Sequence, residues 1–384
     1  MRSKWQLVPI VVRKMKSKWQ LVPIIVLLAL LVAEAYWYIP YTHPDSGKMH
    51  ILDISSNANG AVTIKYELSA SLPLDATVVV TPVQQEPQDL PVYIYYDEDY
   101  PVAGTFWNVT RMLWEHVKTD LALRTYTAEV RLVNAAELEA IFLSKSYGIV
   151  IMASGNFPSN VFSWEKNLAK PWLDAGGTLI WFGWVAGYYT VDKGQEEPVA
   201  WGMPNQLMEE GVKRMGLDSF FEIKAIWEHP ISAESHSPLS ESLDITYSLI
   251  QQAPLINKVV AAGGLILGKI GGETGKLRSS VSVIPIGSGR IIVFGFFPMG
   301  GHVANGPELC AQEVAQILCS GVLDSGSPSN IWHQSYHLSH SETKIDTCTI
   351  HLDKNTVGVV VYGYYATDSS GLLFYREFVT LKGR

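Results

Sequence analysis

The sequence contains little cysteine and little charge. Its three cysteines, Cys310, Cys319 and Cys348, are too few for a scaffold held together by disulfides. Charged residues make up 17% of the chain and hydrophobic residues 47%, whereas a disordered chain needs low hydrophobicity and high net charge. The composition therefore indicates a folded protein, and a length of 384 residues is typical of two or three domains.

Long hydrophobic runs are also scarce. Only residues 21–41 form a run that could cross a bilayer, which excludes a multi-span transporter. Residues 1–20 carry six basic side chains and no acidic one. By the positive-inside rule, we expect a cytoplasmic segment over 1–20, a transmembrane helix over 21–41 and an extracytoplasmic body. The alternative is a cleaved signal peptide with Ala33-Glu34-Ala35 as its cleavage site.

The rest of the chain is acidic. It holds 23 of the 29 basic and all 37 acidic side chains, a net charge of −14. Such a body repels phosphate backbones, so we expect no nucleic-acid binding. At the amino terminus, residues 3–10 recur as residues 17–24, a duplication to which the sequence assigns no role.

Hydrophobic patterning divides the body into three parts. Residues 42–90 contain three β-rich stretches, and residues 326–384 contain four more. Together these seven strands predict a β-sandwich. Between them, over residues 91–325, strands alternate with helices, which is typical of a parallel sheet covered by helices. We therefore predict an α/β domain that is inserted into, or flanked by, β-sandwich structure.

Two local signals within the α/β part are specific. Asn134-Ala135-Ala136-Glu137 has the spacing of a capping box, which predicts a helix that begins after Asn134. The turn Ile286-Gly287-Ser288-Gly289 separates two β-rich stretches, 281–285 and 290–296. That arrangement predicts a β-hairpin.

Three segments carry a resemblance to a known family. They are the strand 92–96 with the acidic loop after it, the strand that ends in Ala153-Ser154-Gly155-Asn156, and the helix–Gly176-Gly177–strand that ends at Gly183. With these segments, residues 92–321 resemble a class I glutamine amidotransferase-like domain. The resemblance implies a flavodoxin-like α/β fold, flanked here by the β-sandwich and preceded by one transmembrane helix.

The family's catalytic residues are missing. Catalytic members carry a cysteine in a G-x-C-x-G turn, whereas this chain reads Gly183-Trp184-Val185-Ala186-Gly187. Their late His-x-Glu pair is also absent, since His302 and Glu308 lie six residues apart. The resemblance thus implies a degenerate elbow, and we expect no catalytic residue, cofactor or metal.

The order of segments is similar to the non-catalytic amidotransferase-like subunits of oligosaccharyltransferase, which handle protein N-glycosylation. The helix–Gly-Gly–strand motif and the late segment 288–297 carry this likeness, although that family has its membrane span at the carboxyl end. It implies a non-catalytic, single-span accessory subunit whose partner is a multi-span membrane glycosyltransferase. The alternatives are a diverged amidotransferase-like hydrolase and a free-standing sugar-binding module.

Aromatic and polar clusters supply the remaining candidates. Trp184, Tyr188, Tyr189 and Trp201 are the candidate interface, because tryptophan and tyrosine combine contact area with a polar group. Asp97-Glu98-Asp99 could bind a divalent cation, but we favour a solvated acidic turn. Asn108 begins the one N-x-[ST] sequon and is a candidate glycosylation site. We expect neither Ser154 nor the histidines at 333, 337 and 340 to form a site.

Overall fold

The computed structural model describes twelve stretches: residues 47–56, 61–84, 90–200, 208–221, 231–235, 243–247, 253–268, 278–299, 306–319, 332–352, 356–367 and 370–380. All of them belong to one compact unit, Gly47–Arg384. The predictions for the basic segment 1–20, the span or signal peptide at 21–41 and the duplicated segment lie outside the described residues.

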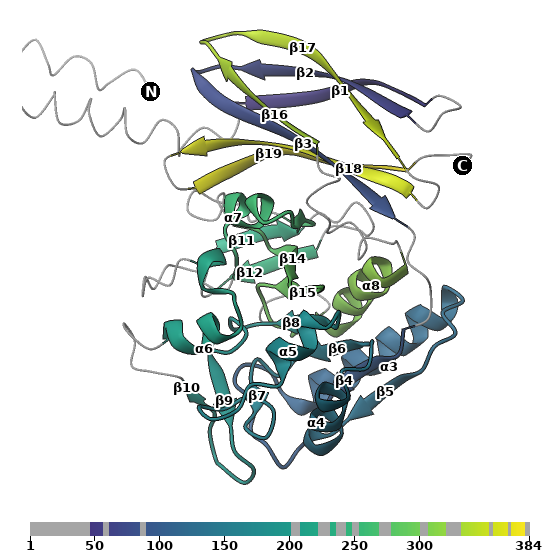
Figure 1. Ribbon diagram of the computed structural model, residues 1–384, viewed down its shortest axis with the longest axis vertical. Coiled ribbons are helices and arrows are strands. Elements are labelled where there is room, and N and C mark those ends of the chain that lie inside the picture. The colour runs from purple at the N-terminus through teal and green to yellow at the C-terminus, as the bar shows by residue number, and fades with distance from the viewer. Residues whose placement is uncertain are drawn as a thin grey trace, which may run out of the picture. The chain divides into compact units, whose positions relative to one another are not determined.

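Seven strands from the two flanks of the chain form two antiparallel sheets (Figure 1). The three-stranded sheet has the order β1 (Gly47–Ser56), β2 (Ala61–Ala70) and β17 (Thr343–His351). The four-stranded sheet has the order β16 (Trp332–Leu338), β3 (Leu74–Gln84), β18 (Thr356–Thr367) and β19 (Ser370–Thr380). Strands that lie far apart in the sequence are therefore neighbours in both sheets.

The four-stranded sheet buries side chains on both of its faces. Val78 and Val361 point into a core shared with the three-stranded sheet. Their neighbours Val79 and Val360 belong instead to the core of the α/β part. Successive residues of a strand point to opposite faces, so this sheet is a middle layer. The unbroken apolar runs of β3 and β18 follow from that position.

The α/β part is built on a seven-stranded mixed sheet. Its order is β13 (Leu265–Ile266), β14 (Val281–Ile286), β15 (Gly289–Phe294), β8 (Thr178–Phe182), β6 (Ile149–Met152), β4 (Val92–Tyr95) and β5 (Val130–Val133). The strands from β15 to β5 run parallel. All residues of β6 and β8 are buried, as expected for strands covered on both faces.

The helices and small sheets complete this part. They are α3 (Trp107–Leu123), α4 (Ala135–Ser144), α5 (Ala169–Asp174), α6 (Met208–Arg214), the 3-10 turn η2 (Asp218–Phe220), α7 (Ile256–Ala261) and α8 (Gly306–Cys319). One small sheet joins β10 (Val199–Ala200), β9 (Tyr189–Val191) and β7 (Phe157–Pro158), and another joins β11 (Ile231–Ser235) and β12 (Leu243–Tyr247).

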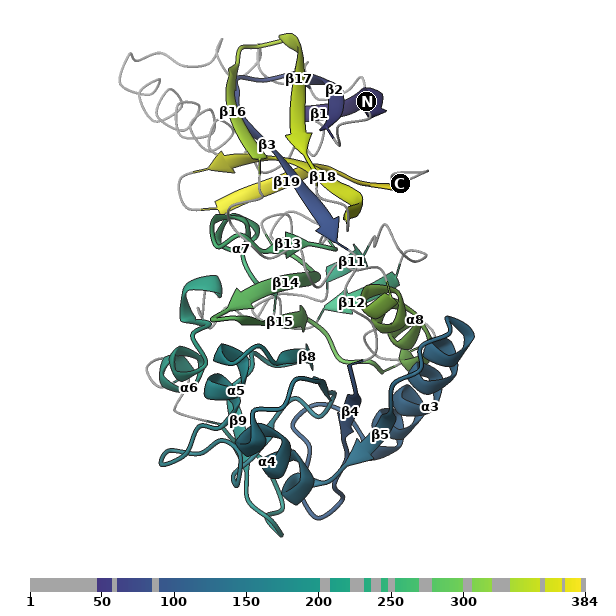
Figure 2. The ribbon, with the colours of Figure 1, turned by 45° about the vertical axis from the view of Figure 1, so that its right-hand side comes forward.

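The predicted fold class, a flavodoxin-like α/β domain with a flanking β-sandwich and an amino-terminal transmembrane helix, is wrong as a whole. Strands far outnumber helices among the described residues. The sheet expected to be parallel is mixed, because the turn between β14 and β15 reverses the chain (Figure 2). In the described parts of the chain, no helix is both long and apolar enough to cross a bilayer. The predicted localisation as a single-pass membrane protein therefore has no support in those parts of the chain, and its span at 21–41 lies outside them.

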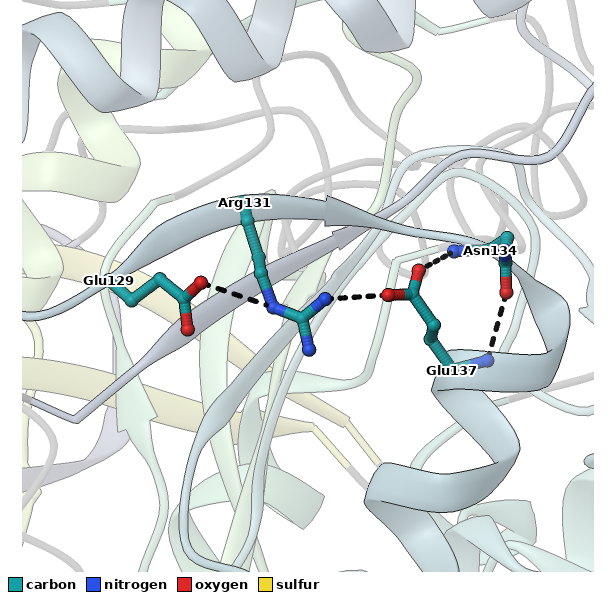
Figure 3. Close-up of polar contacts among 4 residues, drawn as sticks. All are labelled: Glu129, Arg131, Asn134 and Glu137. Atoms are coloured by element: carbon teal, nitrogen blue, oxygen red, sulfur yellow. Dashed lines mark hydrogen bonds and ion pairs between the residues drawn. The ribbon is translucent and has the colours of Figure 1, made fainter.

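The capping box at the start of α4 is confirmed (Figure 3). Asn134 Oδ1 accepts a hydrogen bond from Glu137 N at 2.9 Å, and Glu137 Oε2 accepts one from Asn134 N at 2.9 Å. Arg131 Nη1 reaches the other carboxylate oxygen of Glu137 at 2.7 Å. The backbone hydrogen bond from Asn134, together with Arg131, lowers the pKa of Glu137 below its ordinary value of 4.5.

We predict a small acid-dependent loss of stability from this cap. Because the pKa of Glu137 is lower in the folded chain than in the unfolded chain, its ionised carboxylate stabilises the fold above pH 4.5. This contribution is lost as the pH falls through the pKa that Glu137 has in the folded chain. Because Glu137 and Arg131 are each more than one-third exposed, we expect less than about 1 kcal/mol. Urea denaturation of wild type and Glu137→Gln between neutral and acid pH measures it. If the difference in unfolding free energy between wild type and Glu137→Gln does not become smaller at acid pH, the prediction is wrong.

Candidate functional site

The carboxyl ends of the parallel strands meet at one edge of the sheet, where open α/β sheets bind their ligands. Asp97 follows β4, Ser154 follows β6, Gly183 follows β8 and Phe297 follows β15. This edge is therefore the place to look for chemistry.

The ring of Phe297 fills the middle of this edge. A Cβ atom added to Gly104, Gly155 or Gly183 would lie within 3.0 Å of that ring, closer than real Cβ atoms approach. Gly155 and Gly183 also have φ angles of 75° and 89°, a conformation that glycine adopts most easily. Only 3% of Phe297 is exposed. We call these three glycines the glycine cup, and it holds an aromatic ring of the chain itself.

A short connection crosses the same edge. Residues 101–105, which we call the strap, belong to the connection between β4 and α3. Ala103 N donates hydrogen bonds to Ser154 O at 3.1 Å and to Asn156 Oδ1 at 3.0 Å. Ala103 O accepts a hydrogen bond from Trp184 Nε1 at 3.4 Å. Because Ser154 and Asn156 are fully buried, these bonds fix the strap, and with it Gly104, at this edge.

The degenerate elbow, 183–187, packs at the same edge. Val185 is buried and presents methyl groups where a nucleophile would be needed. Trp184 packs edge-on against Phe297, with ring centroids 6.4 Å apart. Trp181 Nε1 donates a hydrogen bond to Trp184 O, which holds the turn in place. The elbow is therefore well ordered by its packing but carries no group that could attack a substrate.

The candidate interface residues are largely used for internal packing. Trp184 contacts Tyr188 and Tyr189, with ring centroids 5.8 and 5.4 Å apart, and all three side chains are half-buried. Burial raises the pKa of Tyr189 to about 12 and also raises the pKa of Tyr188. Both phenols therefore stay protonated near neutral pH. Trp201 lies outside the described residues.

The acidic turn after β4 has structural partners for its carboxylates. Asp97 Oδ2 accepts a hydrogen bond from Ala135 N at 3.0 Å, and its Oδ1 accepts one from Asp99 N at 3.1 Å. Asp99 forms an ion pair with Lys193 at 2.7 Å, and Glu98 accepts a hydrogen bond from the Tyr96 hydroxyl. Asp97 thus helps to cap α4, a role that only the tertiary structure reveals.

The other sequence candidates lie apart from one another. Ser154 Oγ donates to Asn156 O at 3.1 Å, as a turn residue does. His337 pairs with Asp75 at 2.7 Å on the exposed side of β16. No group of histidine, cysteine or acidic side chains suited to a metal ion occurs in the described residues. Burial raises the pKa of the Cys310 thiol, so it is a poor nucleophile.

The candidate glycosylation site lies in the first turn of α3. Asn108 is exposed, whereas Thr110 is fully buried against the core. Asn108 Oδ1 accepts a hydrogen bond from Val109 N at 3.0 Å. The asparagine is accessible in the folded chain, but the hydroxyl of its sequon is not. Modification of Asn108 stays a prediction.

Comparisons with known proteins find only remote similarity. No family model matches the chain, and no curated protein matches it. A β-galactosidase from Bacillus circulans sp. alkalophilus has 10% identity and a TM-score of 0.35, over 72% of this chain and 35% of that one. A cold-adapted β-galactosidase from Rahnella sp. R3 has 14% identity and a TM-score of 0.31, over 68% and 41%. A cytoplasmic protein from Salmonella typhimurium LT2 has 10% identity and a TM-score of 0.31, over 62% and 100%.

These similarities are too low to assign a fold or a function. The chain spans well under half the length of the two β-galactosidases it matches. Neither of them is named as an amidotransferase-like protein or an oligosaccharyltransferase subunit, so the comparisons give no support to a description of this chain in those terms. The residues of the site are therefore the basis for any statement about function.

Proposed function

We propose that the chain is a non-catalytic accessory subunit, which acts by binding other molecules rather than by transforming them. The observation that carries this proposal is the packing of Phe297 in the glycine cup. A catalytic site at this edge needs room for a substrate next to a nucleophile and a base. Here the room is filled by the chain's own aromatic ring, and the elbow residue is Val185.

Restoring a thiol at the elbow tests the proposal. We expect Val185→Cys to hydrolyse no glutamine, because Phe297 and the strap occupy the substrate position and the family's His-x-Glu pair is missing. Glutamate release from the wild-type chain, the variant and a catalytic amidotransferase in one coupled assay measures this. Glutamate release by the wild type or the variant above the buffer background would refute a non-catalytic role.

The partner is a separate part of the proposal. A multi-span glycosyltransferase stays a prediction from the sequence. Purification of the tagged full chain from its native source, with the molar ratio of each co-purifying protein measured, tests it. A fixed ratio supports an accessory subunit, whereas a chain that purifies alone as a monomer contradicts it.

A further inference from the structure

The core between the two antiparallel sheets contains a chain of polar side chains. Tyr66 of β2 is fully buried, and Tyr336 of β16 is nearly so. Their hydroxyl groups form a hydrogen bond that joins the two sheets (Figure 1). Tyr336 Oη also donates a hydrogen bond to Asp346 Oδ2 of β17 at 2.8 Å. Two phenols and a carboxylate therefore form one connected network.

The direction of each hydrogen bond in this network follows from the charge of Asp346. Hydrogen bonds from Thr347 N and from Tyr336 hold the pKa of Asp346 below its ordinary value of 3.8, so its carboxylate is ionised near neutral pH. An ionised carboxylate only accepts, and the single proton of the Tyr336 hydroxyl therefore points to Asp346. Tyr66 must then be the donor in the hydrogen bond between the two phenols. A proton acceptor is thus already in place beside Tyr336.

The surroundings of the Tyr336 ring favour the loss of an electron together with a proton. Lys344 Nζ lies 4.7 Å from the centre of this ring, and its positive charge opposes a second positive charge there. Burial opposes a charged ring as well, because a charge in the protein interior loses its hydration. If the phenolic proton moves to Asp346 as the electron leaves, the ring stays neutral and both costs are avoided.

Trp332 connects the network to the surface of the chain. It is partly exposed at the start of β16. Its ring meets that of Tyr66 edge-on, with the centroids 6.3 Å apart, and the rings of Tyr66 and Tyr336 are also edge-on, at 6.4 Å. Indole and phenol rings are among the side chains that lose an electron most easily, and electrons pass readily between rings in contact. An oxidant in solution can therefore draw an electron from the buried phenols through Trp332.

We propose that Tyr336 is a one-electron oxidation site, at which the chain traps small radical oxidants such as carbonate or peroxyl radicals. One electron passes from Tyr336 through Tyr66 and Trp332 to the oxidant, which is thereby reduced. The O–H bond of Tyr336 breaks, and its proton forms a new O–H bond at Asp346 Oδ2. The product is a neutral Tyr336 phenoxyl radical, to which Tyr66 still donates its hydrogen bond. This activity is independent of the proposed accessory role, because it uses no residue of the carboxyl edge.

Freeze-quench electron paramagnetic resonance on the full chain tests the site, with hexachloroiridate(IV) as the one-electron oxidant. We expect a long-lived tyrosyl radical in the wild type, because burial keeps Tyr336 away from solvent and from other radicals. Tyr336→Phe should shorten the lifetime of the tyrosyl signal at least about tenfold. Asp346→Asn keeps both phenols but removes the proton acceptor. It should therefore slow formation of the signal at least about tenfold, and the slower formation that we expect for the wild type in D2O should become smaller.

Tyr96→Phe is the matched control, because Tyr96 also donates a hydrogen bond to a carboxylate, that of Glu98, but in an exposed pair. We expect this variant to keep the long-lived signal of the wild type. Circular dichroism establishes that each variant is folded. If the wild type gives no long-lived tyrosyl radical, or if Tyr336→Phe gives one of equal lifetime, the proposal is wrong. Equal rates of radical formation in the wild type and Asp346→Asn would overturn the assignment of Asp346 as the proton acceptor, also where Tyr336→Phe fails to fold.

Discussion

Truncating Phe297 to alanine should destabilise the chain by about 3–5 kcal/mol, the usual cost of emptying a buried aromatic position. The ring is almost fully buried and contacts three glycines from three different connections. None of those glycines has a side chain that could move into the vacated space. The void should therefore stay open, and the loss of stability should lie at the high end of the range. Urea denaturation of wild type and variant gives the difference in unfolding free energy.

A cavity of this shape should also accept a small aromatic molecule. Apolar cavities left by a removed side chain stay dry and bind benzene, and a ligand that binds only the folded state stabilises it. We expect benzene to raise the stability of Phe297→Ala and to leave the wild type unchanged. Phe106→Ala is the control, because Phe106 is 64% exposed; we expect this change to cost less than about 0.5 kcal/mol. If Phe297→Ala lowers the free energy of unfolding by less than about 1 kcal/mol, the ring does not stabilise the fold by filling this space.

The second large effect is expected for Gly183→Ala. Gly183 has a φ of 89°, which costs an alanine about 1–2 kcal/mol. Its new Cβ would also meet the Phe297 ring, and overpacking of this kind typically adds about 1–3 kcal/mol. We therefore expect a loss of roughly 2–5 kcal/mol in total, measured by urea denaturation.

Gly194 separates the two causes. It has a φ of 76°, and nothing lies within 4 Å of an added Cβ, so Gly194→Ala should show the backbone cost alone. The double variant Phe297→Ala/Gly183→Ala should cost clearly less than the sum of its two single changes, because removing the ring removes the clash. Strict additivity of the two changes, or equal costs at Gly183 and Gly194, would contradict the packing described here.

Local elements of the fold could be predicted from the sequence, because their signals lie within a few residues. The capping box needs only Asn134 and Glu137, three positions apart, and the structure confirms it. The hairpin across Gly287 and Ser288 is also confirmed, with Ile286 paired to Gly289. Both depend on backbone conformations that particular residues favour on their own.

The fold class could not be predicted in the same way. An alternation of strands and helices indicates which segments pair, but not the direction or the layer of every strand. The hairpin that was recognised locally is also what makes the sheet mixed. The valines of β3 and β18 gave no sign of the two cores that they contact, since Val78 and Val79 are chemically the same residue on opposite faces.

For the candidate site, the sequence by itself determined one fact: Val185 stands at the elbow and cannot act as a nucleophile. The closed state of that site depends on Phe297 meeting Gly104, Gly155 and Gly183, which are remote from it in the chain. Composition counts the tryptophans, but it does not show that Trp164 is exposed whereas Trp172 and Trp181 are buried. An aromatic side chain suits both a core and a surface, and only its tertiary neighbours decide between the two, because burial is a property of the packed chain and not of the residue.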